Sequence, residues 1–225
     1  MLILALDTAS HLCSAAVFDA GAGRLAGQCV EDIGRGHAER MMAVIDAALQ
    51  EAGAGFADLG RIGVTVGPGS FTGIRVGVAT ARGLALALKI PAVPVTTLAA
   101  IAAAADPEKS AGRPVMALLD ARRGEVYAQL FSPENGPLDE PQALTPAAAA
   151  EIAGSRGAAL IGSGAPLVAE HLTESLPILG TASAADIADV ARLAATAPEG
   201  RPPAPLYLRS PDAKVQAGFA LARQA

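Results

Sequence analysis

The chain has 225 residues, 52% hydrophobic and 17% charged, which is enough to bury the core of one large domain or of two small lobes. A net charge of −5 argues against gripping nucleic acid through a broad basic surface, and 3% aromatic residues disfavour a base-stacking surface. Cys13 and Cys29 are the only cysteines, and we expect buried thiols in the reducing cytoplasm, with a disulfide between them as the alternative.

The opening residues do not predict a signal peptide, and the apolar runs do not predict a membrane span. Residues 1–7 lack a basic start and reach a charge at Asp7. Glycine, proline or charge interrupts every longer apolar run.

The first half of the chain predicts one complete α/β unit. The expected elements, in chain order, are strands at residues 2–6, 14–18 and 24–30, a helix at 37–51, a strand at 62–66, a helix at 73–88, a strand at 92–95 and then an alanine-rich helix. Thr96 or Thr97 is the expected cap of that last helix. Three antiparallel strands followed by alternating helices and strands form a sheet covered by helices.

Residues 107–114 predict a linker between two domains, 1–106 and 107–225. After the linker the opening pattern returns, because Phe131 follows Asp120 at the same eleven-residue spacing that separates Phe18 from Asp7. This indicates a two-fold internal repeat, with chance similarity between two hairpins as the alternative. The remaining expected elements are a strand at 158–161, helices at 166–173 and 184–197, and an extended segment at 201–209. We therefore expect a second lobe that is smaller and poorer in elements.

A glycine-rich loop joins the strand at 62–66 to the helix that follows it. Residues 67–75 read GPGSFTGIR, and three glycines in seven residues indicate a sharp turn or a close approach of the backbone. An anion site at the helix N-terminus and a tightly packed turn are both open alternatives. The loop lacks the Lys-Ser/Thr of a phosphate-binding P-loop, and Thr72 stands where a dinucleotide fingerprint needs glycine.

Two α/β lobes that each open with a strand ending in Asp resemble the actin/Hsp70/sugar-kinase (ASKHA) superfamily, here as a duplication with a reduced second lobe. In that superfamily paired acidic residues face a central cleft and help to hold a metal-bound nucleotide. The resemblance places Asp7, Thr8 and Asp120 at those positions. The alternative for Asp7 is an acid that binds backbone N–H groups of its own turn.

Five motifs spread over essentially the whole chain narrow the resemblance. They are LALDTA at 4–9, GHAER at 36–40, GPGSFTGIR at 67–75, DARRGEVY at 120–127 and PLYLR at 205–209. With them the sequence is similar to the bacterial TsaB (YeaZ) family, the dimerisation subunit of the tRNA threonylcarbamoyladenosine machinery.

The resemblance implies a non-catalytic scaffold. The catalytic paralogue of the family, TsaD, transfers a threonylcarbamoyl group from its adenylate to N6 of the adenosine next to the tRNA anticodon. TsaB pairs with TsaD through N-lobe helices, and a small ATPase, TsaE, binds the pair. We therefore expect contact with tRNA through the complex and no stably bound cofactor. ATP or ADP at the interface of the complex and a homodimer in the absence of the partner stay open.

The paralogue carries a metal-binding His-x-x-x-His just after its Val-Pro-Val strand. At the matching place, after residues 93–95, this chain has Thr97 and Ile101. Isoleucine cannot bind a metal, and none of the three histidines, His11, His37 and His171, has a ligand four residues further on. We expect no metal site and no catalytic residue. Ser70 lacks the nucleophile elbow, which disfavours proteolysis.

The helices at 37–51 and 73–88 are the expected partner seam. The interface residues expected there are His37, Met41, Met42, Gly73, Arg75, Gly77 and Ala81. Small side chains let a partner helix approach closely, and a bulky charge at Gly77 or Ala81 is expected to abolish pairing. Packing on the sheet of the same lobe is the alternative.

The charged turn Arg122, Arg123 and Glu125 is a further expected contact with a partner or tRNA, with a solvated turn as the alternative. The alternative function is an ASKHA-type ATPase or phosphotransferase that acts on a small molecule in the cleft.

Overall fold

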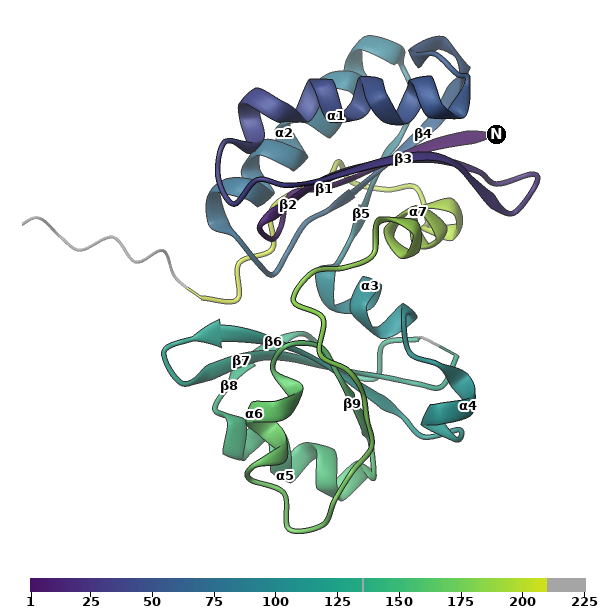
Figure 1. The fold of residues 1–225 in the computed structure, drawn as a ribbon. Helices are drawn as coiled ribbons and strands as arrows, with labels where there is room; N and C mark the ends of the chain where they lie inside the picture. The colour runs from purple at the N-terminus through teal and green to yellow at the C-terminus, as the bar shows by residue number, and fades with distance from the viewer. Residues whose placement is uncertain (135, 210–225) are drawn as a thin grey trace, which may run out of the picture.

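Two five-stranded sheets organise the chain, one in each lobe (Figure 1). The computed structural model describes residues 1–134 and 136–209. The first sheet has the order β3-β2-β1-β4-β5 and the second the order β10-β9-β6-β7-β8. The strands of the first sheet are β1 (Leu2–Asp7), β2 (Leu12–Asp19), β3 (Arg24–Asp32), β4 (Leu59–Thr65) and β5 (Ala92–Val95). Those of the second are β6 (Val115–Arg122), β7 (Glu125–Phe131), β8 (Gln142–Leu144), β9 (Ala159–Ile161) and β10 (Ile178–Gly180).

The two sheets have one topology. Read from its other edge, the second sheet is β8-β7-β6-β9-β10, so β6 to β10 take the places of β1 to β5. In both sheets the first three strands pair antiparallel and the remaining pairs are parallel. This repeat of order and direction confirms the two-lobed α/β duplication predicted from the sequence.

The second lobe is reduced in the length of its strands and not in their number. Strands β8, β9 and β10 have three residues each, whereas β3 has nine and β4 has seven. The expectation of a lobe poorer in elements was therefore wrong for the described residues, since β8, β10 and helix α5 (Pro146–Arg156) were missed. The expected linker contains the short helix α4 (Pro107–Ser110), and helix α6 is limited to Ala165–Ala169.

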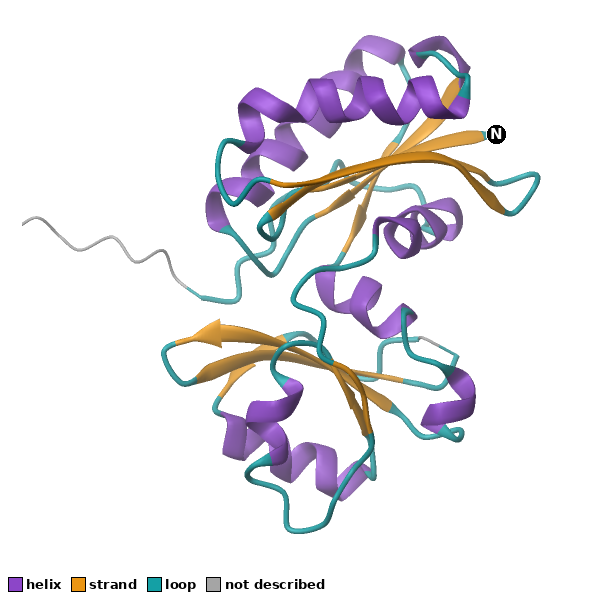
Figure 2. Ribbon diagram, in the orientation of Figure 1, coloured by secondary structure: helices purple, strands orange, loops and turns teal. Residues whose placement is uncertain are grey.

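The helices form three layers around the two sheets (Figure 2). Helices α1 (His37–Ala52) and α2 (Phe71–Leu88) cover the outer face of the first sheet, with the one-turn helix η1 (Phe56–Asp58) leading into β4. Helices α5 and α6 cover the outer face of the second sheet. Helices α3 (Thr97–Ala103) and α7 (Ile187–Thr196) lie between the sheets.

The two middle helices are exchanged between the lobes. Helix α3 follows β5 of the first sheet but packs on β6 and β7, and α7 follows β10 but packs on β1, β2 and β4. Buried residues of both sheets, such as Ile3 and Val115, therefore share one central core with Leu98 of α3 and Val190 of α7. The predicted division at residue 106 separates the two sheets, whereas α7 of the second range packs on the first sheet.

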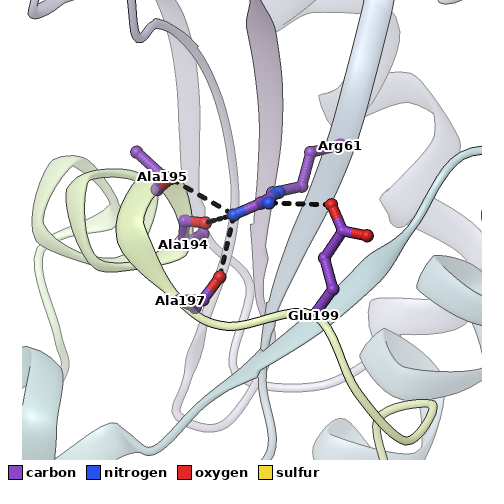
Figure 3. A network of polar contacts seen from close by, with 5 residues as sticks. All are labelled: Arg61, Ala194, Ala195, Ala197 and Glu199. Atoms are coloured by element: carbon purple, nitrogen blue, oxygen red, sulfur yellow. Dashed lines mark hydrogen bonds and ion pairs between the residues drawn. The ribbon is translucent and has the colours of Figure 1, made fainter.

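Arg61 of β4 fixes the end of α7 to the first sheet (Figure 3). Its Nη1 donates to the carbonyl oxygens of Ala194, Ala195 and Ala197 at 3.0, 3.2 and 2.9 Å, and its Nη2 pairs with Glu199 at 3.0 Å. The last four carbonyls of a helix have no partner within the helix, and a cation there also complements the helix dipole. One partly buried guanidinium thus completes the C-terminus of the exchanged helix.

Replacing Arg61 with Met keeps an apolar stem but leaves these carbonyls without a donor. We expect the free energy of unfolding to fall by about 3 kcal/mol, because several hydrogen bonds from a charged group are lost in a partly buried place. Urea denaturation measures the change. Glu199→Gln is the control and should cost less than about 1 kcal/mol, since the Glu199 side chain is 62% exposed. Equal effects of the two variants would contradict the anchoring role.

Candidate functional site

The glycine-rich loop packs against the end of β1. The Ser70 N–H donates to the Ala9 carbonyl at 2.7 Å. A side chain on Gly69 would place its Cβ 2.2 Å from the same carbonyl oxygen. Gly67 has φ 106°, in the region that favours glycine. The loop therefore needs glycine both for its turn and for its contact with β1.

Helix α2 begins against the same stretch of backbone. Ser70 caps the helix by accepting from the Gly73 N–H at 3.2 Å, and the buried hydroxyl of Thr8 donates to the Gly73 carbonyl at 2.7 Å. A Cβ on Gly73 would lie 1.9 Å from the Thr8 carbonyl oxygen, and one on Gly77 would lie 2.5 Å from Thr8 Oγ1. These contacts account for the glycine spacing as a tightly packed turn, and they use the hydroxyl of Thr8 for packing.

Asp7 is buried at the end of β1, with 1% of its surface exposed. Its Oδ1 accepts from the Thr65 hydroxyl at 2.5 Å and from the Ala9 N–H at 2.9 Å, while its buried Oδ2 has no partner among the described residues. Burial raises the pKa of the Asp7 carboxyl above its ordinary value, and the hydrogen bonds from Thr65 and Ala9 oppose that shift.

Asp120 does not mirror Asp7 in the sheets. Ile3 of β1 pairs with Phe18, and Val115 of β6 pairs with Phe131. Ile3 and Val115 are therefore equivalent positions of the repeat. Asp7 lies four residues after Ile3, and the residue four positions after Val115 is Leu119, so Leu119 is the equivalent of Asp7. Since side chains alternate along a strand, Asp120 lies on the opposite face.

The side chain of Asp120 is occupied in its own turn. The Oδ1 atom accepts from the Arg122 N–H at 2.7 Å, and the backbone N–H of Asp120 donates to Ser163 Oγ at 3.1 Å. The arrangement in which two acidic residues face each other across the cleft, implied by the ASKHA resemblance, is therefore not formed by Asp7 and Asp120. The equal spacing of eleven residues from each Asp to the following Phe did not reveal that the two hairpins differ in register by one residue.

A cavity of about 480 Å³ lies between the lobes. Its polar lining includes Ser10, His11, Ser70 and Thr97 from the first half of the chain and Asp120, Arg122, Ser163 and Ser183 from the second. Thr97 Oγ1 is buried without a partner in the described residues. The cavity therefore offers hydroxyls, the His11 imidazole, the Asp120 carboxylate and the Arg122 guanidinium, and Asp7 and Thr8 are not part of its lining.

The positions matched to the paralogue's metal histidines lie at the start of α3. Thr97 is the first residue of that helix, and Ile101 is buried in the central core. His37 is buried with its Nε2 3.1 Å from the Leu12 carbonyl oxygen, which is a packing role. Across residues 1–134 and 136–209, no group of three or more His, Cys, Asp or Glu side chains is placed to hold a metal ion.

The charged turn between β6 and β7 is tied to the C-terminal segment. Arg122 and Arg123 both have left-handed backbone angles, with φ 64° and 57°. Glu125 forms an ion pair with Arg209, whose guanidinium also donates to the Ala121 and Arg122 carbonyls. Glu125 therefore has an internal partner, and the solvated-turn alternative does not describe this residue.

The comparisons with known proteins identify the family. The family model described as TsaD, tRNA N6-adenosine threonylcarbamoyltransferase, matches residues 27–157, more than half of the chain. The solved structure of YeaZ from Pseudomonas aeruginosa superposes with a TM-score of 0.78 at 29% identity, covering 92% of this chain and 99% of that chain. The chain belongs to the TsaB (YeaZ) family.

The curated relatives agree with this family. The "tRNA threonylcarbamoyladenosine biosynthesis protein TsaB" of Escherichia coli is 39% identical over 60% of this chain, and its counterpart in Bacillus subtilis is 33% identical over 62%. The matched parts span 58% and 59% of the lengths of these two relatives. An uncharacterised protein of Mycobacterium tuberculosis is 35% identical over 94% of this chain and 93% of its own length.

Most of the expected partner residues face inward. Met41, Gly73, Gly77 and Ala81 are buried in the outer core of their own lobe, as is His37. A bulky charge at Gly77 or Ala81 would therefore disrupt the lobe itself, and the expectation that these two residues meet a partner was wrong. Glycine and alanine occur on both the buried and the exposed sides of α2, so the sequence alone does not show which side packs on the sheet.

A different stripe of α2 faces outward. Six of its exposed residues follow helical spacing, and together with exposed Met42 of α1 we call them the α2 face: Phe71, Arg75, Ala79, Arg82, Gly83 and Leu86. Leu86 is 82% exposed, Met42 45% and Phe71 38%. Met42 and Arg75 are thus the two expected interface residues that lie on the surface.

The same helix is unusually apolar for a helix on the surface. Of the helices in the described ranges, only α2 is long and apolar enough to cross a bilayer by length and composition. Arg75 and Arg82 interrupt its outer face, as the sequence analysis expected of the longer apolar runs, and its inner face packs on β4, β1 and α1. The packing on the sheet makes α2 a layer of the α/β fold with one apolar side uncovered.

Gly73→Ala tests the close approach of α2 to β1. The added methyl would collide with the Thr8 carbonyl, so we expect a loss of about 3 kcal/mol or more in the free energy of unfolding. Gly83→Ala, in the same helix, is the matched control, because a methyl group there would meet nothing within 4 Å beyond its own neighbours in the helix. It should stabilise the chain by about 0.5–1 kcal/mol, because alanine is the better helix former. Chemical denaturation of both variants decides the matter, and a tolerated Gly73→Ala would refute the contact.

Asp7→Asn tests the buried carboxyl. Because the folded-state pKa is raised, the contribution of Asp7 to stability is fully present below about pH 3.8 and is lost as the pH rises through the raised value. The asparagine variant cannot ionise. As the pH rises from 3.5 to 7, its free energy of unfolding should therefore increase relative to that of the wild type. Urea unfolding at several pH values measures the difference. Parallel pH curves for the two proteins would contradict a raised pKa.

Proposed function

We propose that this chain is the non-catalytic scaffold subunit in the addition of a threonylcarbamoyl group to N6 of the adenosine next to the tRNA anticodon, and that it acts by docking a TsaD-type catalytic paralogue. The family supports the pathway, since its relatives are described as tRNA threonylcarbamoyladenosine biosynthesis proteins. The observation that carries the docking role is the α2 face.

The α2 face has the composition of a helix-docking surface. Isolated exposed apolar residues are common on proteins, but here Leu86, Phe71 and Met42 lie on two adjacent helices of one layer. Ala79 and Gly83 lie along the same stripe and let a second helix approach closely. Arg75 and Arg82 supply charge beside the apolar residues, as at the rim of many interfaces.

The residues at the start of α3 support a role without catalysis. Where the resemblance places the metal histidines of the paralogue, this chain has a buried threonine and a buried isoleucine, Thr97 and Ile101. In this proposal the paralogue supplies the metal and the transfer chemistry, and tRNA and the TsaE-type ATPase are bound by the complex in the cytoplasm. ATP or ADP belongs to the interface of that complex, and a homodimer through the α2 face is the state expected without the partner.

Leu86→Glu tests the docking face. We expect affinity for the cognate catalytic paralogue to fall at least about ten-fold, because a charge would be buried in the proposed interface. Leu138→Glu is the matched control, since Leu138 is 52% exposed and lies in the second lobe. Sedimentation with the purified paralogue measures binding, and threonylcarbamoyl transfer to tRNA with the paralogue, the ATPase and the adenylate measures activity.

Three outcomes of this experiment are informative. If Leu86→Glu weakens both binding and transfer while Leu138→Glu changes neither, the scaffold proposal is supported. If the two variants behave alike, the partner binds elsewhere. If the paralogue transfers equally well without this chain, the proposal fails. The inter-lobe cavity, with its unpartnered Thr97 hydroxyl, should then be screened for ATP hydrolysis or phosphotransfer.

A further inference from the structure

The C-terminal segment returns from α7 and passes between the two lobes. The chain crosses between the sheets at α3 and α4 and again at residues 181–186. Figure 1 shows the yellow segment after α7 running along the first lobe and then toward the β6–β7 hairpin of the second. Its residues 206–209 contact both lobes through two separate sets of interactions.

The first anchor joins this segment to the start of α2. The Leu206 N–H donates to the Val66 carbonyl at 2.7 Å. The ring of Tyr207 lies 4.9 Å from the ring of Phe71, and its hydroxyl accepts from Arg75 Nε at 2.8 Å. The Arg75 guanidinium also lies 3.8 Å from the centroid of the Phe71 ring. The contact between the two rings and two hydrogen bonds thus hold the segment to the first lobe, and the Arg75 guanidinium also lies 5.7 Å from the centroid of the Tyr207 ring.

The second anchor joins the same segment to the second lobe only two residues later. Arg209 donates through Nη1 to the Ala121 carbonyl at 3.2 Å and through Nη2 to the Arg122 carbonyl at 3.4 Å. It also forms the ion pair with Glu125. The Arg209 guanidinium thus binds two carbonyls and one carboxylate at the same turn, which its several N–H donors allow.

The two anchors sit beside opposite walls of the inter-lobe cavity. Val66 directly precedes the loop whose Gly69 and Ser70 line the first wall, and Ala121 and Arg122 line the second. We propose that residues 206–209 are a non-covalent latch that holds the two walls together and sets the opening of the cavity. Release of either anchor lets the lobes rotate about the two chain crossings while α3 and α7 stay packed.

Distances between spin labels on the outer helices test the latch in the isolated chain. Gln50 of α1 and Glu151 of α5 are exposed and lie in opposite outer layers, so Gln50→Cys and Glu151→Cys report on the separation of the lobes. Cys29→Ser removes the half-buried native thiol. Burial raises the pKa of the Cys13 thiol to about 11, so it carries little reactive thiolate near pH 7.

The test variants remove one anchor each. Tyr207→Ala and Arg209→Ala should give a longer and broader distance distribution than the parent chain. Arg201→Ala is the matched control, because Arg201 is exposed in the same segment and has no polar partner within residues 1–134 and 136–209. It removes the same charge and should leave the distribution unchanged. Unchanged distributions for Tyr207→Ala and Arg209→Ala, in chains whose circular dichroism shows that they are folded, would overturn the proposal.

Milder changes keep the test decisive if an alanine variant does not fold. Tyr207→Phe keeps the ring contact with Phe71 and removes only the hydroxyl, so its distribution should lie between those of the parent and a fully released latch. Glu125→Gln removes the ion pair from the hairpin side and should broaden the distribution in the same direction. If neither variant changes the distances, the latch is rejected. The measurement needs no partner protein, so its result is independent of the scaffold proposal.

Discussion

The exchange of helices between the lobes is the constraint on which the rest of the structure depends. Each sheet has one face covered by its own helices and one face covered by a helix from the other half of the chain. Burial of apolar surface is the main stabilising term in folding, so separating the two halves would expose both inner faces at once. The contacts of α7 join residues more than 130 positions apart, as Arg61 and Ala194 illustrate. The lobes are therefore one cooperative unit, and Arg61 secures the helix that makes them so.

The exchange of helices also determines which faces of the sheets and helices are buried and which stay exposed. The inner faces of the sheets are used by the exchanged helices, and the outer face of the second sheet is covered by α5 and α6. In the first lobe, three glycines bring α2 against the end of β1, which seats its inner side tightly. Its outer side exposes apolar residues beside Arg75 and Arg82 and is covered only where Tyr207 contacts Phe71 and Arg75, and that is the surface that the proposed function uses. Phe71 and Arg75 belong both to this surface and to the latch, so a partner on the α2 face would contact the latch directly.

The sequence predicted the long elements and the repeat because their signals are local. Apolar periodicity marked the first-lobe strands and helices, and the return of a strand ending in Asp marked the second lobe. Three-residue strands such as β8 and β10 are too short to show alternation, and the alanine-rich α5 has little contrast between its faces. The site was harder to predict, since the side of the sheet on which Asp120 lies depends on a one-residue difference in register between the β1–β2 and β6–β7 hairpins. The stack of Phe71, Arg75 and Tyr207 joins residues about 130 apart, which no local pattern reveals.

The central claim is that a TsaD-type partner covers the α2 face. Hydrogen exchange of this chain, measured by mass spectrometry with and without the cognate catalytic paralogue, tests it most directly. The account predicts that the partner slows exchange in peptides from α1 and α2, around Met42 and between Phe71 and Leu86, and leaves α5 unchanged. Protection confined to α5, to the β6–β7 hairpin or to the cavity lining, with α2 unaffected, would contradict it.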